Sequence, residues 1–331
     1  MKTLKIISLC FAVMFLPAVL QAQPFEPMNK NATKEARELL TYLYELSGDK
    51  ILSGQHNYGH ELLRSTDTIV QYTGKQPAIW GSDWIPRDFK VDIDRGETAN
   101  EAIRQHKKGS IITLMYHQSR PYADSMGYFR NKISDEEWEQ LIIPGTPIHQ
   151  TWLADIDEVA GHMKKLQKKN VPVLWRPYHE MNGGWFWWGK RTGENGYKKL
   201  WRILYDRLTN YHKLNNLIWV WNANELRGNN VVSYEDYYPG HDVVDLLATD
   251  VYTGNYDKRN YDALHELADG RPIAIGECGP VPTQELLNNQ PEWVWFMIWA
   301  RFPWGEKNGP EKIRELYNHP RVLTKEEVEI N

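Results

Sequence analysis

Short apolar runs recur along this chain, and most are separated by segments long enough to form a helix. Each run follows a turn residue, usually Gly or Asn, and is itself followed by polar residues. Runs of this kind are typical of buried strands. The eight runs are residues 51–54, 78–81, 111–115, 171–175, 217–221, 246–251, 273–275 and 294–300.

The alternation of strands and helices predicts parallel pairing. Eight such units in a chain of 331 residues favour a closed (β/α)8 TIM barrel in a single domain. An open, doubly wound sheet is the alternative. No GxGxxG sequence follows any of the runs, and this removes the commonest sign of a nucleotide-binding open sheet.

Three segments lie outside this regular pattern. Residues 33–48 predict an amphipathic helix, with Leu39, Leu40, Leu43 and Leu46 on one face and a stop at Gly48. The preceding residues 23–32 are polar and are expected to form a flexible lead. The longest connection runs from residue 118 to about 150. In a barrel it would lie at the end where the strands finish, where active sites form. It is either a wall of a cleft or an inert surface loop.

The N-terminus has the pattern of a targeting segment. Lys2 and Lys5 precede an apolar stretch over residues 6–20, and a cleavage site fits before Gln23. A membrane anchor is the alternative, although the stretch is short for a span. We therefore expect residues 1–22 to be a signal peptide and the mature chain to be periplasmic or secreted, without membrane association. Cleavage removes Cys10 and leaves Cys278, so no internal disulfide is expected.

Composition narrows the class of protein. The chain is 41% hydrophobic and 25% charged, which is typical of a globular protein, and its net charge is −4. Nothing in this balance indicates nucleic acid or an anionic membrane as a partner. Fifteen tryptophans and eighteen tyrosines are many, and they serve either sugar binding or core packing.

The fourth run leads into the segment with the most chemistry, VPVLWRPYHEMNGGWFWWG over residues 171–189. Arg176, His179 and Glu180 follow the strand, and four aromatic residues come shortly after. A carboxylate at the end of a buried strand is costly unless it is paired or functional. Aromatic faces beside polar groups suit sugar rings. The alternative is a buried, salt-linked Glu180 next to an aromatic core cluster.

A second carboxylate, Glu277, stands in PIAIGECG at the end of the seventh run. Glycoside hydrolysis commonly needs two carboxyl groups across the scissile bond. Because the carboxyl ends of barrel strands form its open face, Glu180 and Glu277 are expected to converge there. Glu225 is expected to be a surface or cleft residue and Asp250 a structural hydrogen-bond partner. No HExxH or CxxC sequence is present, so neither a metal nor another cofactor is expected.

WRPYHEMNG followed by WFWWG closely resembles the acid/base motif of glycoside hydrolase family 26, and the similarity runs from about residue 39 to 302. The family consists mostly of β-mannanases with a (β/α)8 fold and two catalytic glutamates. The resemblance implies a family 26-like catalytic barrel over residues 23–331. It also implies retaining chemistry, with Glu180 as acid/base and Glu277 as nucleophile.

The resemblance also assigns substrate-binding roles. It implies that His117 and His179 contact sugar hydroxyls or carboxylates and that Arg176 and Tyr252 hold the nucleophile. Trp185 corresponds to an aromatic wall and Trp299 to an aromatic floor. Trp187 and Trp188 are as consistent with packing as with binding.

The resemblance implies an endo-β-1,4-mannanase acting on mannan, galactomannan or glucomannan, and we expect it to be a monomer. A lichenase or β-1,3-xylanase of the same family is an alternative, since the family includes those activities. A non-catalytic glycan-binding protein is another.

Overall fold

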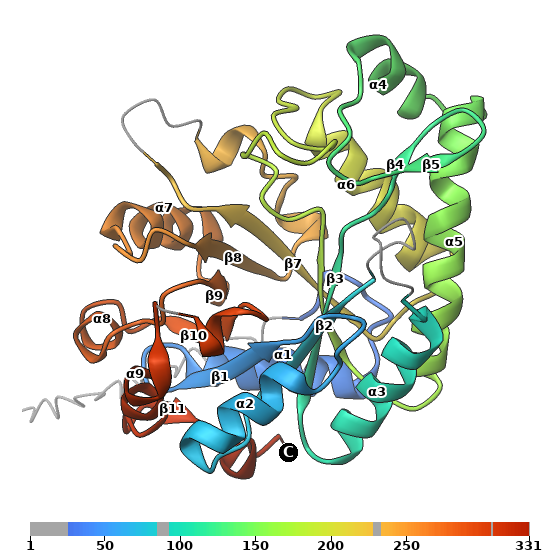
Figure 1. Cartoon of the computed structure of the whole chain (residues 1–331). Coiled ribbons are helices and arrows are strands. Elements are labelled where there is room, and N and C mark those ends of the chain that lie inside the picture. Colours follow the sequence, from blue (N-terminus) through green and yellow to red (C-terminus); the bar gives the residue numbers. More distant parts are fainter. Residues whose placement is uncertain (1–25, 85–92, 228–232, 306, 331) are drawn as a thin grey trace, which may run out of the picture.

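Eight parallel strands close into a barrel in the computed structural model, which describes residues 26–84, 93–227, 233–305 and 307–330 (Figure 1). Each strand pairs with the next, and the last pairs back to the first, Leu52 aligning with Trp295. The TIM barrel prediction is therefore confirmed and the open sheet is excluded. The barrel strands are β1 (Ile51–His56), β2 (Ile79–Asp83), β3 (Ile111–Tyr116), β6 (Val173–Pro177), β7 (Leu217–Asn224), β8 (Leu246–Val251), β9 (Ile273–Cys278) and β10 (Trp293–Ile298).

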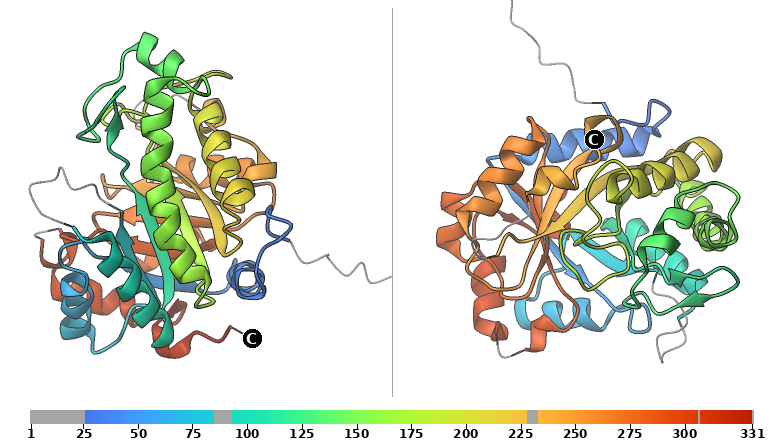
Figure 2. Two further views of the ribbon diagram at one scale, coloured as in Figure 1. Left: turned by 90° about the vertical axis from the view of Figure 1, so that its right-hand side faces the viewer. Right: turned by 90° about the horizontal axis from the view of Figure 1, so that it is seen from above.

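Helices surround the strands on the outside, as the two views in Figure 2 show. They begin and end at recognisable signals: the Asp94 side chain caps α3 by accepting from the backbone of Gly96, and a left-handed Gly74 ends α2. The outer helices are α2 (Arg64–Thr73), α3 (Arg95–Lys107), α5 (Pro147–Gln167), α6 (Tyr197–Tyr205) with its π-helical extension η1 (Asp206–Tyr211), α7 (Lys258–Ala268), α8 (Gln284–Asn289) and α9 (Gly309–Tyr317). Short 3-10 turns are η2 (Tyr234–Asp236), η3 (His241–Val243), η4 (Phe302–Trp304) and η5 (Lys325–Glu327).

The predicted N-terminal helix, α1 (Lys34–Leu46), closes the barrel at the end where the strands begin. Its buried leucines pack in one cluster with barrel residues such as Leu52, Leu174 and Ile218. The strands are buried on both faces, so the other side of the sheet packs against the helices in a second cluster. The open end, where the strands finish, is thus the face left for a site.

Tryptophan mostly serves packing in this protein. Trp187 and Trp188 are buried in the helix–strand cluster, where their indole N–H groups donate to the carbonyls of Gln118 and His179 at 2.9 and 2.8 Å. The structure therefore favours packing for these two residues. Others that are almost fully buried are Trp80, Trp84, Trp152, Trp175, Trp201, Trp219, Trp221, Trp293 and Trp295.

The expectation of a flexible lead is wrong for residues 28–32. The Met28 amide donates to Asp245 Oδ1 at 2.7 Å, and buried Asn29 donates from Nδ2 to Asn215 Oδ1 at 3.0 Å. Asp245 comes directly before β8, so this segment is fixed at the same end of the barrel as α1. Polarity alone misled the prediction, because these polar groups bond to the protein rather than to water.

The long connection after β3 contains structure of its own. A small hairpin, β4 (Arg120–Pro121) and β5 (Met126–Gly127), leads to α4 (Asp135–Leu141). Ser134 and Glu137 form a capping box at the start of α4. The hairpin and α4 lie at the top of Figure 1, next to the upper end of α5.

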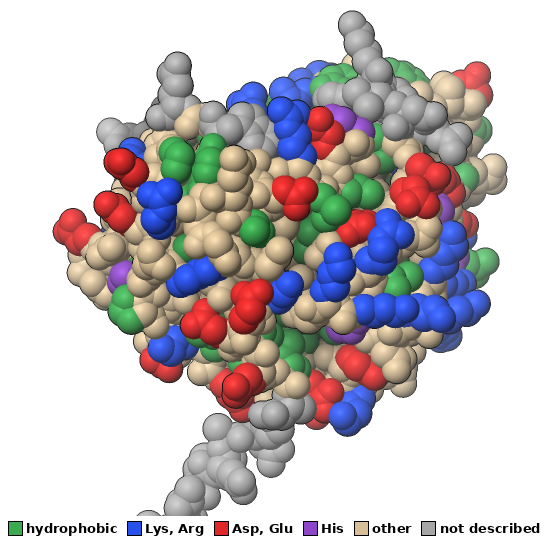
Figure 3. All heavy atoms as spheres, turned by 60° about the horizontal axis from the view of Figure 1, so that its bottom comes forward, with side chains coloured by type: hydrophobic (Ala, Val, Ile, Leu, Met, Phe, Trp, Pro, Cys, Tyr) green, Lys and Arg blue, Asp and Glu red, His purple; other side chains and the backbone are tan. Residues whose placement is uncertain are grey.

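One face of the molecule is of mixed charge. On the face in Figure 3, basic and acidic side chains are interspersed, with small hydrophobic areas between them. The expected signal peptide lies outside the described residues. No helix in the described part of the chain is both long and apolar enough to cross a bilayer.

Candidate active site

The turn after β6 places Glu180 at the open end of the barrel. Tyr178 and Glu180 both adopt left-handed backbone conformations, with φ of 48° and 54°. The Glu180 amide donates to the Asn222 carbonyl at 2.8 Å, and Asn182 exchanges two hydrogen bonds of 2.8 Å with the backbone of Asn224. The end of β7 therefore holds the turn in a conformation that non-glycine residues adopt at a cost.

Glu277 lies within β9 and belongs to a different set of contacts. The Tyr252 hydroxyl donates to Glu277 Oε2 at 2.5 Å. Arg176 Nη2 and His179 Nε2 each lie 3.7 Å from Oε1. The Tyr252 hydroxyl and the Arg176 guanidinium favour the ionised form of Glu277.

The two carboxyl groups have different proton affinities for physical reasons. Burial and the nearby charge of Glu277 raise the pKa of Glu180 to about 8, against a smaller opposing effect of the hydrogen bond from Trp185 Nε1. Burial also raises the pKa of Glu277, but Arg176 and the Tyr252 hydroxyl act in the opposite direction. The partners of Glu277 thus favour its charged form, whereas the surroundings of Glu180 favour its protonated form.

A polar layer lies under the two glutamates. Arg176 is fully buried, donates from Nη1 to Asn222 Oδ1 at 2.6 Å and lies 3.9 Å from Asp250. Burial and the charge of Glu277 raise the pKa of Asp250 well above its usual range. The layer leaves no room for a side chain at position 276, since a Cβ on Gly276 would lie 1.9 Å from Asn222 Oδ1.

Histidines and aromatic rings form the other side of the site. His117 Nδ1 hydrogen-bonds the carboxylate of Asp83, and the His117 ring meets that of His179 edge to face with centroids 4.4 Å apart. Trp299 stacks on His56 at 4.2 Å with the rings 10° from parallel. Burial lowers the pKa of His56 to about 3, so this supporting ring is neutral.

These groups enclose a cleft of about 600 Å³. It brings together seven of the eight residues singled out from sequence; the eighth, Arg176, lies beneath the cleft. The loop after β3 contributes Tyr128, Phe129 and Arg130, so the cleft-wall interpretation holds for that part of it. The seven predicted residues are His117, His179, Glu180, Trp185, Tyr252, Glu277 and Trp299.

Several residues around this cleft were missed from sequence. His56 and Asp83 end barrel strands, Asn222 lies near the end of β7, and Arg227 comes shortly after β7. Their common signal is a polar side chain at or near the end of an apolar run, which was not interpreted for these four residues. A second groove, of about 730 Å³, lies outside the barrel along α5, α6 and η1 and contains none of the predicted site residues.

One group among the described residues could present three metal ligands. Single ligand atoms of His179, Asp250 and Glu277 lie within 4.8 Å of one another. The guanidinium of Arg176 is already next to both carboxyl groups, at 3.9 and 3.7 Å, so a cation is already in place there. The residues present fit an Arg-centred polar cluster better than a metal site.

Comparison with known proteins agrees with this geometry. A model of the family described as glycosyl hydrolase family 26 matches residues 28–327. The chain belongs to glycosyl hydrolase family 26. A family 26 structure from a Muricauda species, GH26A, is 45% identical, with a TM-score of 0.87 over 91% of this chain and 99% of that one. The structure of a Podospora anserina GH26-CBM35 beta-(1,4)-mannanase is 34% identical, with a TM-score of 0.81 over 92% and 69% of the two chains.

Among curated relatives, a mannan endo-1,4-beta-mannosidase of Thermothelomyces thermophilus is 35% identical over 91% of this chain. The chain spans 63% of that relative's length and 50% and 53% of two Piromyces relatives. The chain thus spans about half to two thirds of the length of these relatives.

Proposed function

We propose that this family 26 member is an endo-β-1,4-mannanase that cleaves mannan, galactomannan or glucomannan with retention of configuration. The observation that carries the proposal is the pair of buried glutamates in one cleft with opposite surroundings. Burial and Glu277 keep Glu180 protonated, whereas Arg176 and Tyr252 stabilise the charge of Glu277. Two carboxyl groups with separated proton affinities are what a general acid and a nucleophile require.

In the first step, Glu277 attacks the anomeric carbon while the glycosidic bond breaks. Glu180 gives its proton to the departing oxygen, so the leaving group departs as a neutral alcohol. The result is a glycosyl ester on Glu277 and an ionised Glu180. In the second step, Glu180 takes a proton from water, and the resulting hydroxide-like oxygen displaces Glu277 from the anomeric carbon.

The substrate class comes from the relatives, four of which are named as mannan-cleaving enzymes. The cleft supplies surfaces that suit sugar rings. Trp299 is held flat by the His56 ring, and Trp185 is fixed by its hydrogen bond to Glu180. Both are partly exposed in the cleft, where an aromatic face can stack on the CH face of a sugar.

A panel of polysaccharides tests the proposal. Mannan, galactomannan, glucomannan, mixed-linkage glucan and xylan should be incubated with the protein, and the product lengths followed over time. Early release of mixed mannooligosaccharides is expected, because an internal cut yields fragments of many lengths. Glu277→Gln is the control, since it keeps the shape of the cleft and removes the attacking carboxylate.

Other outcomes identify the alternatives. Preferential cleavage of mixed-linkage glucan or xylan would assign the protein to another activity of the family. Binding of mannan without any reducing sugar release, by a folded wild-type protein, would make it a glycan-binding protein. Release of a single short product from the start would replace internal cutting with action from a chain end.

We further propose that residues 1–22 are removed on export and that the mature protein is a periplasmic or secreted monomer. The basic start, the apolar stretch and the site before Gln23 support this. Mass spectrometry of the exported protein and light scattering of the purified protein test the two statements. A mass that includes residues 1–22, or a dimer in solution, would contradict them.

A further inference from the structure

Glu225, the first residue after β7, is buried although it does not belong to the catalytic pair. Its carboxylate accepts five hydrogen bonds. Oε1 accepts from the backbone amides of Tyr252 and Thr253, both at 2.9 Å, and from Arg227 Nε and Nη2 at 3.2 and 2.8 Å. Oε2 accepts from the Thr253 hydroxyl at 2.5 Å. The sequence predicts a residue at the surface or in the cleft, but the Glu225 side chain is only 1% exposed.

The hydrogen bonds from Tyr252 and Thr253 connect Glu225 to the nucleophile. Two backbone amides and one hydroxyl fix the turn that follows β8, and this turn carries Tyr252. The Tyr252 hydroxyl in turn donates to Glu277. A backbone bond from the Glu225 amide to the Asp250 carbonyl, at 2.9 Å, holds the same two strand ends together. Tyr252 is therefore positioned by Glu225 rather than by its own ring contacts alone.

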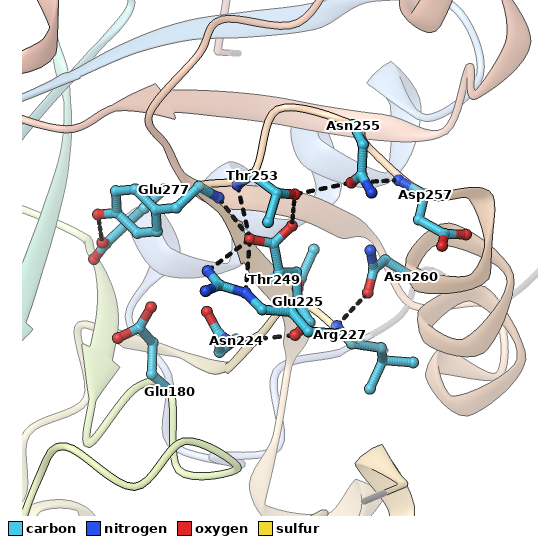
Figure 4. A network of polar contacts seen from close by, with 12 residues as sticks. Glu180, Asn224, Glu225, Arg227, Thr249, Thr253, Asn255, Asp257, Asn260 and Glu277 are labelled. Atoms are coloured by element: carbon cyan, nitrogen blue, oxygen red, sulfur yellow. Dashed lines mark hydrogen bonds and ion pairs between the residues drawn. The ribbon is translucent and has the colours of Figure 1, made fainter. Parts of the chain in front are cut away.

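The hydrogen bonds from Arg227 connect Glu225 to the surroundings of the acid/base. Arg227 lines the cleft together with Glu180, and its side chain is 49% exposed. In Figure 4 its guanidinium lies beneath the carboxylate of Glu225, on the side of the network that faces Glu180 and Glu277. A guanidinium that is free to move in this position would pair with the carboxylate form of Glu180.

We propose that Glu225 is a positioning residue of the active site, which fixes the turn that carries Tyr252 and holds the guanidinium of Arg227 away from Glu180. This inference rests on the proposed function in one respect, that Glu180 must keep its proton to act as the acid. A positive charge that pairs with a carboxyl group lowers its pKa by about one to three units. The ion pair between Glu225 and Arg227 thus protects the protonated state of Glu180.

The test is the pH profile of kcat/KM for Glu225→Gln. Glutamine keeps an oxygen for the two backbone amides but removes the charge that holds Arg227. We expect the alkaline limb, which reports deprotonation of the acid, to move down by about one pH unit or more. At the pH optimum of the wild type, activity should fall about tenfold.

Arg227→Met in the Glu225→Gln background separates positioning from plain structural support. Without the guanidinium of Arg227, its pairing with Glu180 is lost. Because the charge of Arg227 already has a small lowering effect on the pKa of Glu180 in the wild type, the alkaline limb should return to the wild-type pH or slightly above it. The matched control is Glu101→Gln on α3, another buried glutamate, which accepts from Arg104 Nε at 2.6 Å far from the cleft. It should lower stability without moving either limb.

An unmoved limb in Glu225→Gln would overturn the inference, and so would a shift that persists after Arg227→Met. If glutamine prevents folding, Glu225→Asp keeps the charge but is too short to reach both the amides and Arg227, and the limb should move in the same direction. An unmoved limb in folded Glu225→Asp would then overturn the inference.

A measurement without turnover distinguishes this inference from the proposed function. The Glu180 carboxyl can be titrated by carbon NMR in protein labelled at glutamate Cδ and assigned with Glu180→Gln. Its pKa should fall in Glu225→Gln and recover in the double variant, whether or not the wild type cleaves mannan. A pKa that does not fall in Glu225→Gln would reject the positioning role even if the enzyme is an active mannanase.

Discussion

Glu180 and Glu277 have the same side chain, yet the protein surrounds them with different neighbours. Glu180 is buried, accepts a hydrogen bond from the neutral indole of Trp185, and feels smaller effects from the charges of Arg227 and Arg130. Glu277 is buried with a phenol donor and the guanidinium of Arg176 nearby. Since burial acts on both, the partners decide which of the two holds the proton.

The two glutamates should therefore respond differently to truncation. Glu180→Ala should cripple hydrolysis of polysaccharide but spare the first step on an aryl glycoside, whose leaving group needs no proton. Azide should then speed turnover, because a small anion attacks the glycosyl ester without a base. Glu277→Ala should lose both activities. If azide instead rescues Glu277→Ala while Glu180→Ala is inactive on both substrates, the roles are reversed.

The pH dependence of the wild type follows from the same surroundings. The reaction needs Glu277 ionised and Glu180 protonated, so kcat/KM should be bell-shaped. Activity should be lost as pH rises through the pKa of Glu180, which is about 8, and as pH falls through that of Glu277. Rates on a short mannooligosaccharide, with circular dichroism to verify the fold at each pH, measure both limbs. An alkaline limb in the acidic range would show that another group is the acid.

At the level of elements, the apolar runs predicted the positions of the strands well but not the residues at which they end. The seventh apolar run stops at residue 275, whereas β9 continues through Glu277 to Cys278, because the barrel buries these residues despite their polarity. The eighth run overshoots β10, which ends at Ile298, so that Trp299 leaves the strand and reaches the cleft. The substructure after β3 was not predicted, since two-residue strands have no periodicity to detect.

The candidate site was predictable where one local stretch contained several of its groups, as around Glu180. It was not predictable where the contact joins distant strands. His56 supports Trp299 because closure of the barrel pairs β1 with β10, and Asp83 bonds His117 because β2 pairs with β3. Glu225 was underestimated for the same reason, since its partners Tyr252 and Thr253 belong to the next unit.

Helix α1 is expected to contribute to stability but not to catalysis. Leu43 is fully buried where α1 closes the barrel, so Leu43→Ala should lower the free energy of unfolding by about 2–5 kcal/mol. The activity of the folded protein should not change, because α1 lies at the opposite end from the cleft. Urea unfolding and kcat measure the two effects. Glu45→Ala, at an exposed position of the same helix, is the control and should change stability little.

For the whole molecule, closure of the barrel divides the surface into two functionally different ends. The end where the strands begin is filled by α1 and by the segment around Asn29. The end where they finish carries Glu180, Glu277 and the cleft. This division agrees with the way in which barrel enzymes separate stability from catalysis.

The C-terminal segment also lies at the filled end. Strand β11 (Val322–Leu323) pairs with the first residues of β1, and Thr324 bridges to Pro77 just before β2. Both ends of the described chain therefore leave the molecule on the side away from the cleft, so anything attached there points the cleft outward. If the chain is attached to a solid support or to another domain at this end, the cleft therefore stays accessible to a polysaccharide. A folded protein fused at the C-terminus should change kcat/KM on polysaccharide by less than about twofold. A fusion that slows cleavage of the polymer, but not of a short oligosaccharide, would show instead that this end lies in the path of the glycan.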